Sequence, residues 1–335
     1  MGSDRIAVPL LDWLAGEGRE IARLAAVFTQ PDRPAGRGQK IASSAIKAWT
    51  YKHGLPVFQP EKLTDDVRAE LAALETDVVL VMAYGHILRE EFISAPRLGT
   101  LNLHGSLLPK YRGASPIQTA IASGERETGV SLMRIERRLD AGPVADQERV
   151  PIAPLDTAIE LEAKLAAASV LLLARTLPRL RGSTLIFSPQ DDTAASYCRR
   201  LEKNDSALEF SASAAVLAAR INGLFPWPGC AVELDGQQVK FGLADAVTDE
   251  FRQAVDAPHL PGTKMAAVEK MIPGKVLGHD QDGLLIGTGR GVLRVRRLQR
   301  PGGRMLPAME FLRGFPVTVG ATLPSRNMRQ LVTIR

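Results

Sequence analysis

The sequence predicts two domains: an α/β domain built on a mostly parallel sheet, followed by a small antiparallel β-barrel. Three observations carry this prediction. The chain has 335 residues, more than the roughly 100–200 residues that one domain usually holds. Helical and strand patterns alternate through its first part, which is typical of a parallel sheet flanked by helices. Beyond Trp227 the pattern changes to short alternating runs separated by turn residues, as in a small barrel.

The first part of the chain contains five helical patterns and five strand patterns. Pro9 stands where a first-turn proline belongs, and Thr157 and Glu160 form a capping box that opens a long helix. We expect helices at about 9–16, 44–53, 64–75, 116–124 and 157–181, and strands at 24–29, 77–83, 101–104, 130–135 and 144–151. This alternation is Rossmann-like, and ligands of such sheets bind beyond the carboxyl ends of the strands.

The character of the chain changes near residue 188, where a polar stretch containing a proline follows the last long helix. We then expect one helix at 212–221 and an OB-like barrel with short strands at 231–234, 238–241, 275–278, 283–287 and 291–298. The expected organisation is a first domain over residues 1–188, a linker over 189–205 and a second domain over 206–335.

Composition excludes several classes of protein. With 45% hydrophobic and 24% charged residues, the chain is typical of soluble globular proteins. Its longest apolar runs, such as residues 78–83, are far shorter than the roughly 18–20 residues of a membrane-spanning helix. The two cysteines, Cys198 and Cys230, have no neighbours at metal-ligand spacing, so we expect neither a disulfide framework nor a metal. The start resembles no signal peptide, and we expect a cytoplasmic protein.

Charge is distributed unevenly along the chain. The net charge is +5, yet residues 1–205 are neutral, and residues 206–335 hold 16 Lys and Arg against 11 Asp and Glu. Between Arg290 and Arg335 there are ten arginines and one acid, Glu310. This local excess indicates a polyanionic partner, most simply a nucleic acid. The alternative is a solubilising surface.

The densest polar cluster directly follows an expected strand. Asn102 and His104 are two residues apart, so their side chains share one face of that strand. A histidine beside an amide can serve as a proton-transfer group and an oxyanion donor. For this pair alone a structural role is the more frequent outcome. Asp140, in a loop between two expected strands, strengthens the catalytic interpretation because its carboxylate can orient the imidazole.

These residues lie in recognisable motifs. Residues 102–113 (NLHGSLLPKYRG) and 139–143 (LDAGP) resemble the signatures of the formyltransferase family that uses 10-formyltetrahydrofolate. Residues 29–38 (TQPDRPAGRG), 59–63 (QPEKL) and 225–229 (FPWPG) are similar to the branch of that family that formylates the methionyl group of initiator tRNA. The resemblance extends over essentially the whole chain, and its motifs stand in the same order.

The resemblance implies that Asn102, His104 and Asp140 are the catalytic residues. The α-amino group of the methionyl ester would attack the formyl carbon on N10 of the folate, which creates a tetrahedral oxyanion. Asn102 and a protonated His104 can donate hydrogen bonds to this oxygen. The Asp140 carboxylate would raise the pKa of the histidine and hold a water that relays the proton from the amine to N10.

The resemblance also implies where the folate co-substrate binds. We expect it against the loop after the catalytic strand and against the backbone that follows the preceding strand. The residues concerned are Ser106, Leu107, Leu108 and Pro109, together with His86, Ile87 and Leu88. For His86 we expect the backbone rather than the ring to take part. The sequence contains no GxGxxG motif after a first strand, which disfavours a dinucleotide.

Two basic regions are expected to meet tRNA. The loop with Arg33, Arg37 and Lys40 is implied to reach the acceptor end of initiator tRNA, although an ordinary surface loop is the alternative. In the second domain we expect contacts to phosphates from Arg294, Arg296 and Arg297. The aromatic and proline motif at 225–229 is expected to be structural. We expect a monomer that does not associate with membranes.

One stretch departs from the family pattern. The family begins with an apolar strand that leads into a turn, whereas here Met1-Gly2-Ser3 already resembles that turn. We therefore expect an exposed strand edge and a less stable first domain. Two competing functions stay open: formylation of a nucleotide-sugar amine, and a catalytically impaired homologue that binds tRNA. The basic second domain argues against the first, and the intact catalytic trio argues against the second.

Overall fold

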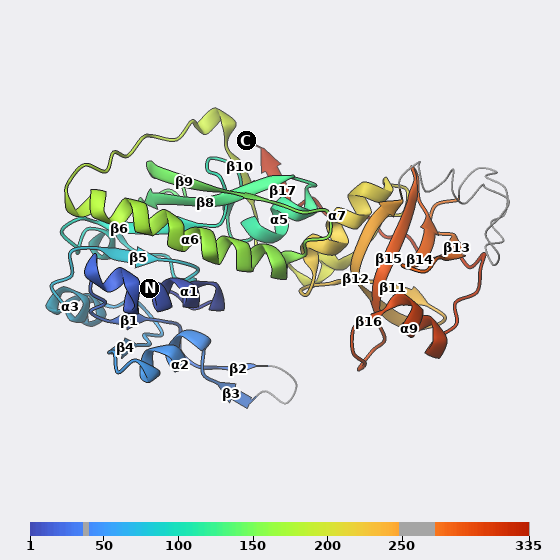
Figure 1. The fold of residues 1–335 in the computed structure, drawn as a ribbon, viewed down its shortest axis with the longest axis horizontal. Helices are drawn as coiled ribbons and strands as arrows, with labels where there is room; N and C mark the ends of the chain where they lie inside the picture. Colours follow the sequence, from blue (N-terminus) through green and yellow to red (C-terminus); the bar gives the residue numbers. More distant parts are fainter. Residues whose placement is uncertain (36–39, 248–271, 335) are drawn as a thin grey trace.

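The computed structural model describes residues 1–35, 40–247 and 272–334, which form two lobes lying side by side along the long axis of the molecule (Figure 1). The first lobe contains a mixed sheet covered by helices. The second lobe is a curled antiparallel sheet with a helix at each end of its chain segment. The predicted fold class, an α/β domain followed by a small barrel-like domain, is confirmed.

The main sheet of the first lobe has the order β5-β6-β8-β9. Strands β5 (Val79–Val81) and β6 (Thr100–His104) are parallel, and β8 (Glu127–Arg134) and β9 (Val144–Pro151) add an antiparallel hairpin. A separate parallel pair joins β1 (Val27–Phe28) to β4 (Val57–Phe58). Because β5 and β6 run in the same direction, the loops that follow them meet at one edge of the sheet.

Five helices of this lobe lie where the apolar pattern predicts them, and the short helix α4 (Glu90–Ile93) was not predicted. Helix α6 (Ala158–Arg181) carries the predicted capping box of Thr157 and Glu160 and buries Leu161, Leu165 and Leu172 completely. Side chains of Ser44 and Thr64 cap two further helices. The remaining helices of this lobe are α1 (Val8–Ala15), α2 (Ala45–Lys52), α3 (Asp65–Ala73), α4 (Glu90–Ile93) and α5 (Pro116–Ala122), with the 3-10 turns η1 (Arg5–Ala7), η2 (Glu17–Glu20), η3 (Asp192–Ala194) and η4 (Lys203–Ser206).

The first two residues lie between β1 and β5. Gly2 donates to the carbonyl of Phe28 at 3.0 Å, the amide of Met82 donates to the carbonyl of Met1 at 2.9 Å, and Gly2 pairs with Met82 as a parallel bridge. A mainly apolar pocket of about 360 Å³ opens beside this bridge. Met1 and Gly2 thus partly cover the predicted strand edge. The same two residues also line the pocket.

The second lobe has the strand order β11-β12-β15-β14-β13, with β16 added beside β15, and all neighbours are antiparallel. Its core is a single cluster that includes the fully buried Phe210, Leu217 and Phe241. The elements are α7 (Ala214–Leu224), β11 (Cys230–Leu234), β12 (Gln237–Val247), β13 (Val276–His279), β14 (Leu284–Gly287), β15 (Val292–Gln299), β16 (Leu306–Pro307) and α9 (Ala308–Gly314).

Two of the contacts between the lobes matter for the site. Helix α7 packs on α5, and a Cβ placed on Gly223 would lie 2.6 Å from the backbone of both Ala122 and Gln118. A small sheet with the order β17-β10-β7 joins the end of the chain, β17 (Val332–Ile334), through β10 (Ser196–Cys198) to β7 (Arg112–Gly113). The segment expected as a linker therefore supplies a strand that lies on the first lobe (Figure 1).

A short hairpin of β2 (Arg33–Ala35) and β3 (Lys40–Ala42) leaves the first lobe at its lower edge (Figure 1). Within the described parts of the chain, no helix is both long and apolar enough to span a bilayer.

Candidate active site

Asn102 and His104 project from the carboxyl half of β6, the strand between β5 and the hairpin. Asn102 is opposite Met133 and His104 is opposite Ser131 in the register with β8. Side chains two apart on a strand share a face, as predicted. The Asn102 side chain is half-buried and makes no hydrogen bond to any described residue, so its amide is available to a ligand.

His104 is 6% exposed and is oriented by two groups. Its Nε2 lies 2.9 Å from the carbonyl oxygen of Tyr111, and its Nδ1 lies 3.7 Å from Oδ2 of Asp140. Because a carbonyl oxygen only accepts hydrogen bonds, Nε2 carries a proton. The other ring nitrogen, Nδ1, is the one that faces Asp140. The structure thus brings the sequence-predicted His104 and Asp140 together.

Asp140 is held in an uncommon backbone conformation in the loop between β8 and β9. Its φ is +50°, in the left-handed region, and its Oδ2 accepts a hydrogen bond from the amide of Gly113 at 2.9 Å. Gly113 itself must be glycine, because a Cβ there would lie 2.2 Å from the carbonyl oxygen of Cys198. The β7–β10 pairing thus sets the amide that orients the carboxylate.

The loop after β6 is anchored by the hairpin beneath it. Ser131 Oγ donates to the Ser106 carbonyl at 2.6 Å and accepts from the Leu108 amide at 3.0 Å. Gln147 Nε2 donates to the Leu108 carbonyl at 2.9 Å. Of the four predicted folate contacts here, Ser106 and Leu108 are buried, and Leu107 and Pro109 are half-buried. This loop therefore offers a rigid backbone and two accessible side chains.

The loop after β5 contains two buried polar atoms without a hydrogen-bond partner among the described residues, Oη of Tyr84 and Nε2 of His86. The two rings meet edge to face, with centroids 5.1 Å apart, and burial raises the pKa of Tyr84 to about 12. Of the other predicted contacts, Ile87 is 90% exposed and Leu88 is buried. The unpartnered Nε2 makes the His86 ring available to a ligand, which differs from our expectation of backbone alone. No motif in the sequence indicates Tyr84 as a site residue.

The segment that leads into the β2–β3 hairpin contacts the same loop. Arg33 Nη2 donates to Oε1 of Gln30 at 3.0 Å, and Gln30 Nε2 donates to the Tyr84 carbonyl at 3.3 Å. Asp32 forms an ion pair with Lys47 at 2.6 Å, which lowers the pKa of that carboxyl. The predicted tRNA contact Arg37 and the side chain of Lys40 lie outside the described residues; Lys40 begins β3.

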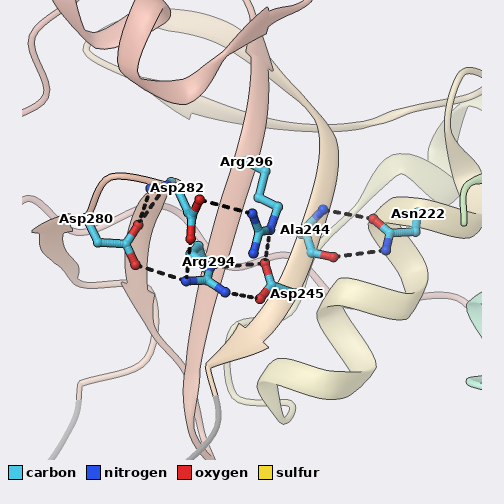
Figure 2. Close-up of polar contacts among 8 residues, drawn as sticks. Asn222, Ala244, Asp245, Asp280, Asp282, Arg294 and Arg296 are labelled. Carbon is cyan, nitrogen blue, oxygen red and sulfur yellow. Dashed lines mark hydrogen bonds and ion pairs between the residues drawn. The ribbon is translucent and has the colours of Figure 1, made fainter. Parts of the chain in front are cut away.

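In the second lobe, two of the three arginines predicted to contact phosphates are engaged in ion pairs (Figure 2). Arg294 lies 2.5 Å from Asp245 and 3.1 Å from Asp280, and Arg296 lies 2.6 Å from Asp245. Asp282 lies 3.4 Å from Arg294 and 3.5 Å from Arg296. Three carboxylates thus compensate two guanidinium groups. These ion pairs reduce the positive charge that the two arginines offer to phosphates, and their contact with tRNA stays a prediction.

Other arginines of this lobe remain open to solvent. Arg297 is exposed at the end of β15, and further exposed arginines follow it on the turn before β16 and on α9. Across the described ranges, none of these forms an ion pair with a carboxylate: Arg297, Arg300, Arg304 and Arg313. Arg300 Nη1 lies 3.5 Å from the carbonyl of Gly314, so the turn and the end of α9 are adjacent. These four arginines form what we call the α9 basic surface.

Comparisons with known proteins identify relatives that match over both lobes. The chain matches the formyl transferase family over residues 2–177 and the C-terminal domain of formyl transferases over residues 200–316. It is 40% identical to a methionyl-tRNA formyltransferase of Ralstonia nicotianae, over 90% of this chain and 91% of that protein. A methionyl-tRNA formyltransferase of Methylococcus capsulatus is also 40% identical, over 93% of this chain and 94% of that protein.

Solved structures share the fold at lower sequence identity. An N-formyltransferase from Helicobacter canadensis, crystallised with folinic acid and dTDP-3-aminofucose, matches with a TM-score of 0.62 at 18% identity, over 89% of this chain and 97% of that chain. The sequence matches to the family extend over both lobes and include the strand that carries Asn102 and His104. The chain belongs to the methionyl-tRNA formyltransferase family of formyl transferases.

Proposed function

We propose that this chain transfers the formyl group of 10-formyltetrahydrofolate to the α-amino group of the methionyl residue on initiator tRNA. The observation that carries the proposal is the site at the carboxyl end of β6, where Nδ1 of His104 faces Asp140 at 3.7 Å and Asn102 shares the face of the strand. The names of relatives about 40% identical to the chain support the same reaction.

The site residues have complementary roles in this reaction. The neutral amine attacks the formyl carbon, a new C–N bond forms, and the carbonyl oxygen becomes an oxyanion. The free amide of Asn102 donates to that oxygen, and Nδ1 of His104 donates when it is protonated. When the bond between the formyl carbon and N10 breaks, N10 takes the proton that the amine releases. Asp140 stabilises the imidazolium during this transfer.

The folate would bind between the loops that follow β5 and β6. A pterin ring carries both donors and acceptors along its edge, and the unpartnered Oη of Tyr84 and Nε2 of His86 provide matching groups. Ile87, Leu107 and Pro109 supply apolar contacts next to them. This fit rests on buried polar atoms that the described protein residues leave without partners.

The tRNA would contact both lobes. The α9 basic surface supplies guanidinium groups that form no ion pair with a described carboxylate. Arg33, which reaches the Tyr84 loop through Gln30, places residues 30–33 next to the folate site. We include Arg37 and Lys40 among the residues that contact tRNA because the sequence motif that contains them resembles that of the family. We assign the chemistry to a catalytic domain over residues 1–188, joined by the 189–205 linker to a tRNA-binding domain over residues 206–335. The protein acts as a cytoplasmic monomer.

The direct test incubates the purified protein with 10-formyltetrahydrofolate and charged initiator tRNA and follows the aminoacyl group by mass spectrometry. We expect a gain of one formyl group on methionine, and no gain with His104→Ala. Parallel reactions use a nucleotide-sugar amine as acceptor and uncharged tRNA as a binding probe. Formylation of the sugar amine alone would overturn the proposed acceptor, and tRNA binding without any formyl transfer would overturn the enzymatic role.

A further inference from the structure

The position of Asp140 depends on a residue of the segment between the two lobes. Gln190 Nε2 donates hydrogen bonds to the carbonyl oxygens of Asp140, at 2.9 Å, and of Gly142, at 2.7 Å. Asp140 occupies the left-handed region, with φ of +50°, a conformation that costs free energy for a residue with a side chain. The two hydrogen bonds from one amide hold the loop in that conformation on both sides of Ala141.

The orientation of the Gln190 amide is fixed in turn by Arg112. The side chain of Arg112 is completely buried, and its Nε and Nη2 both donate to Oε1 of Gln190, at 3.0 and 2.8 Å. If the amide were rotated by 180°, its NH2 group would face two N–H donors and its oxygen would face two carbonyl oxygens. That arrangement has no hydrogen bonds and is repulsive, so only one orientation is stable.

Arg112 reaches Asp140 by a second route as well. The amide of the next residue, Gly113, donates to Oδ2 of Asp140 at 2.9 Å. The remaining nitrogen of the guanidinium, Nη1, donates to Asp192 Oδ1 at 2.8 Å and lies 3.2 Å from Tyr197 Oη. One buried arginine is therefore connected to both the backbone and the carboxylate of the acid that faces His104.

We propose that Gln190, oriented by Arg112, is a positioning residue for formyl transfer: it holds Asp140 at its distance from Nδ1 of His104. The inference rests on the proposed function of Asp140. A displacement of about 1 Å at a catalytic group can cost about 100-fold in rate, so loss of this contact affects turnover although Gln190 touches neither substrate. The segment between the lobes thus takes part in building the site.

The test compares four proteins in steady-state formylation of methionyl initiator tRNA: the unmodified chain, Gln190→Glu, Asp140→Ala and the double variant. Glutamate keeps an acceptor for Arg112 but replaces the two N–H donors with an oxygen that faces two carbonyls. We expect Gln190→Glu to lower kcat by about 10–100-fold, with KM for both substrates changed less than about threefold. In the Asp140→Ala background the same change should cost nothing further, because residues that act as a unit are not additive.

Controls separate positioning from folding. Arg97→Ala removes the exposed ion pair of Arg97 with Asp77 at 2.6 Å and should leave kcat unchanged. Thermal unfolding is measured for every variant, and Gln190→Ala replaces Gln190→Glu if the latter is unfolded at the assay temperature. Equal losses from Gln190→Glu in the presence and absence of Asp140 overturn the inference, as does unchanged kcat. Full activity of Asp140→Ala would instead overturn the proposed function.

Discussion

The amino group of Met1 donates a hydrogen bond to the carbonyl oxygen of Leu80 at 2.6 Å, inside the first lobe. Burial of this ammonium lowers its pKa from the ordinary value of 8.0 to about 5. Desolvation disfavours the charged form, so the folded protein holds this amine uncharged at neutral pH. The amine lies between two parallel strand pairs, β1–β4 and β5–β6.

A pH-dependent stability follows for the chain that begins at Met1. Between pH 5 and 8 the unfolded chain binds a proton that the folded protein does not, so the free energy of unfolding should decrease as the pH falls through this range. The limit is about 4 kcal/mol, from about 1.4 kcal/mol per pKa unit. Denaturant titrations at pH 5.5 and 8 measure the difference. Acetylation of the amine should remove most of it; an equal slope in the acetylated protein would contradict the assignment.

Replacement of the proton-transfer pair should affect chemistry rather than binding. We expect His104→Ala and Asp140→Ala each to lower kcat by at least about 100-fold, as for a positioned acid–base group, with little change in tRNA affinity. Steady-state kinetics and a filter-binding titration measure the two quantities. His279→Ala, at an exposed histidine of β13, is the matched control. A folded His104→Ala protein with normal turnover would show that the mechanism is wrong.

The salt dependence of tRNA binding should locate the surface that meets phosphates. Each phosphate contact contributes roughly one unit to the slope of log affinity against log salt. Replacing Arg297, Arg300 and Arg313 with Gln should therefore flatten the slope by roughly two to three units. The matched control is Arg294→Gln with Arg296→Gln, whose guanidinium groups are held by Asp245; here we expect an unchanged slope and a lower Tm. An unchanged slope in the triple variant, together with a flatter slope in the Arg294 and Arg296 variant, would instead place the phosphate contacts at Arg294 and Arg296.

The contact between the lobes should be sensitive to one methyl group. Gly223→Ala raises intrinsic helix propensity by about 1 kcal/mol, but its Cβ would lie 2.6 Å from the backbone of α5. We expect a net loss of about 1–3 kcal/mol, since helix backbones cannot give way as a flexible side chain can. Ala215→Gly, on the exposed face of α7, should also destabilise, through propensity alone. If Gly223→Ala raised the Tm while Ala215→Gly lowered it, the close contact between α7 and α5 would not limit stability.

The sequence predicted those elements whose signals are local. Helix α6 could be placed because Thr157 and Glu160 form its cap and an apolar stripe runs along it. Asn102 and His104 could be paired because the two-residue period of a strand is short-range information. Asp140 could be assigned to the same site only because it lies in a loop between two expected strands and within a motif that resembles the family signature.

The remaining features depend on contacts between distant residues. Strands β7 and β10 have two and three residues, too few for any periodic pattern, and they pair across more than eighty positions of sequence. The same limitation applies to the ion pairs of Arg294 and Arg296. Counting charges between 290 and 335 omits Asp245, which lies on β12, and Asp280, which lies in the turn between β13 and β14. Local composition cannot reveal charges that the register of a sheet brings together.

The pairing of β17 with β10 makes the first lobe a discontinuous folding unit. Its sheet edge near the active site consists of β7, then β10 from the segment between the lobes, then β17 from residues 332–334. A protein cut at residue 188 would lose both outer strands of this edge and the Gln190 amide with them. The catalytic half therefore cannot be separated with this edge intact by a single cut in the gene, and a chain that folds from its amino end completes the edge only after residues 332–334 have been made.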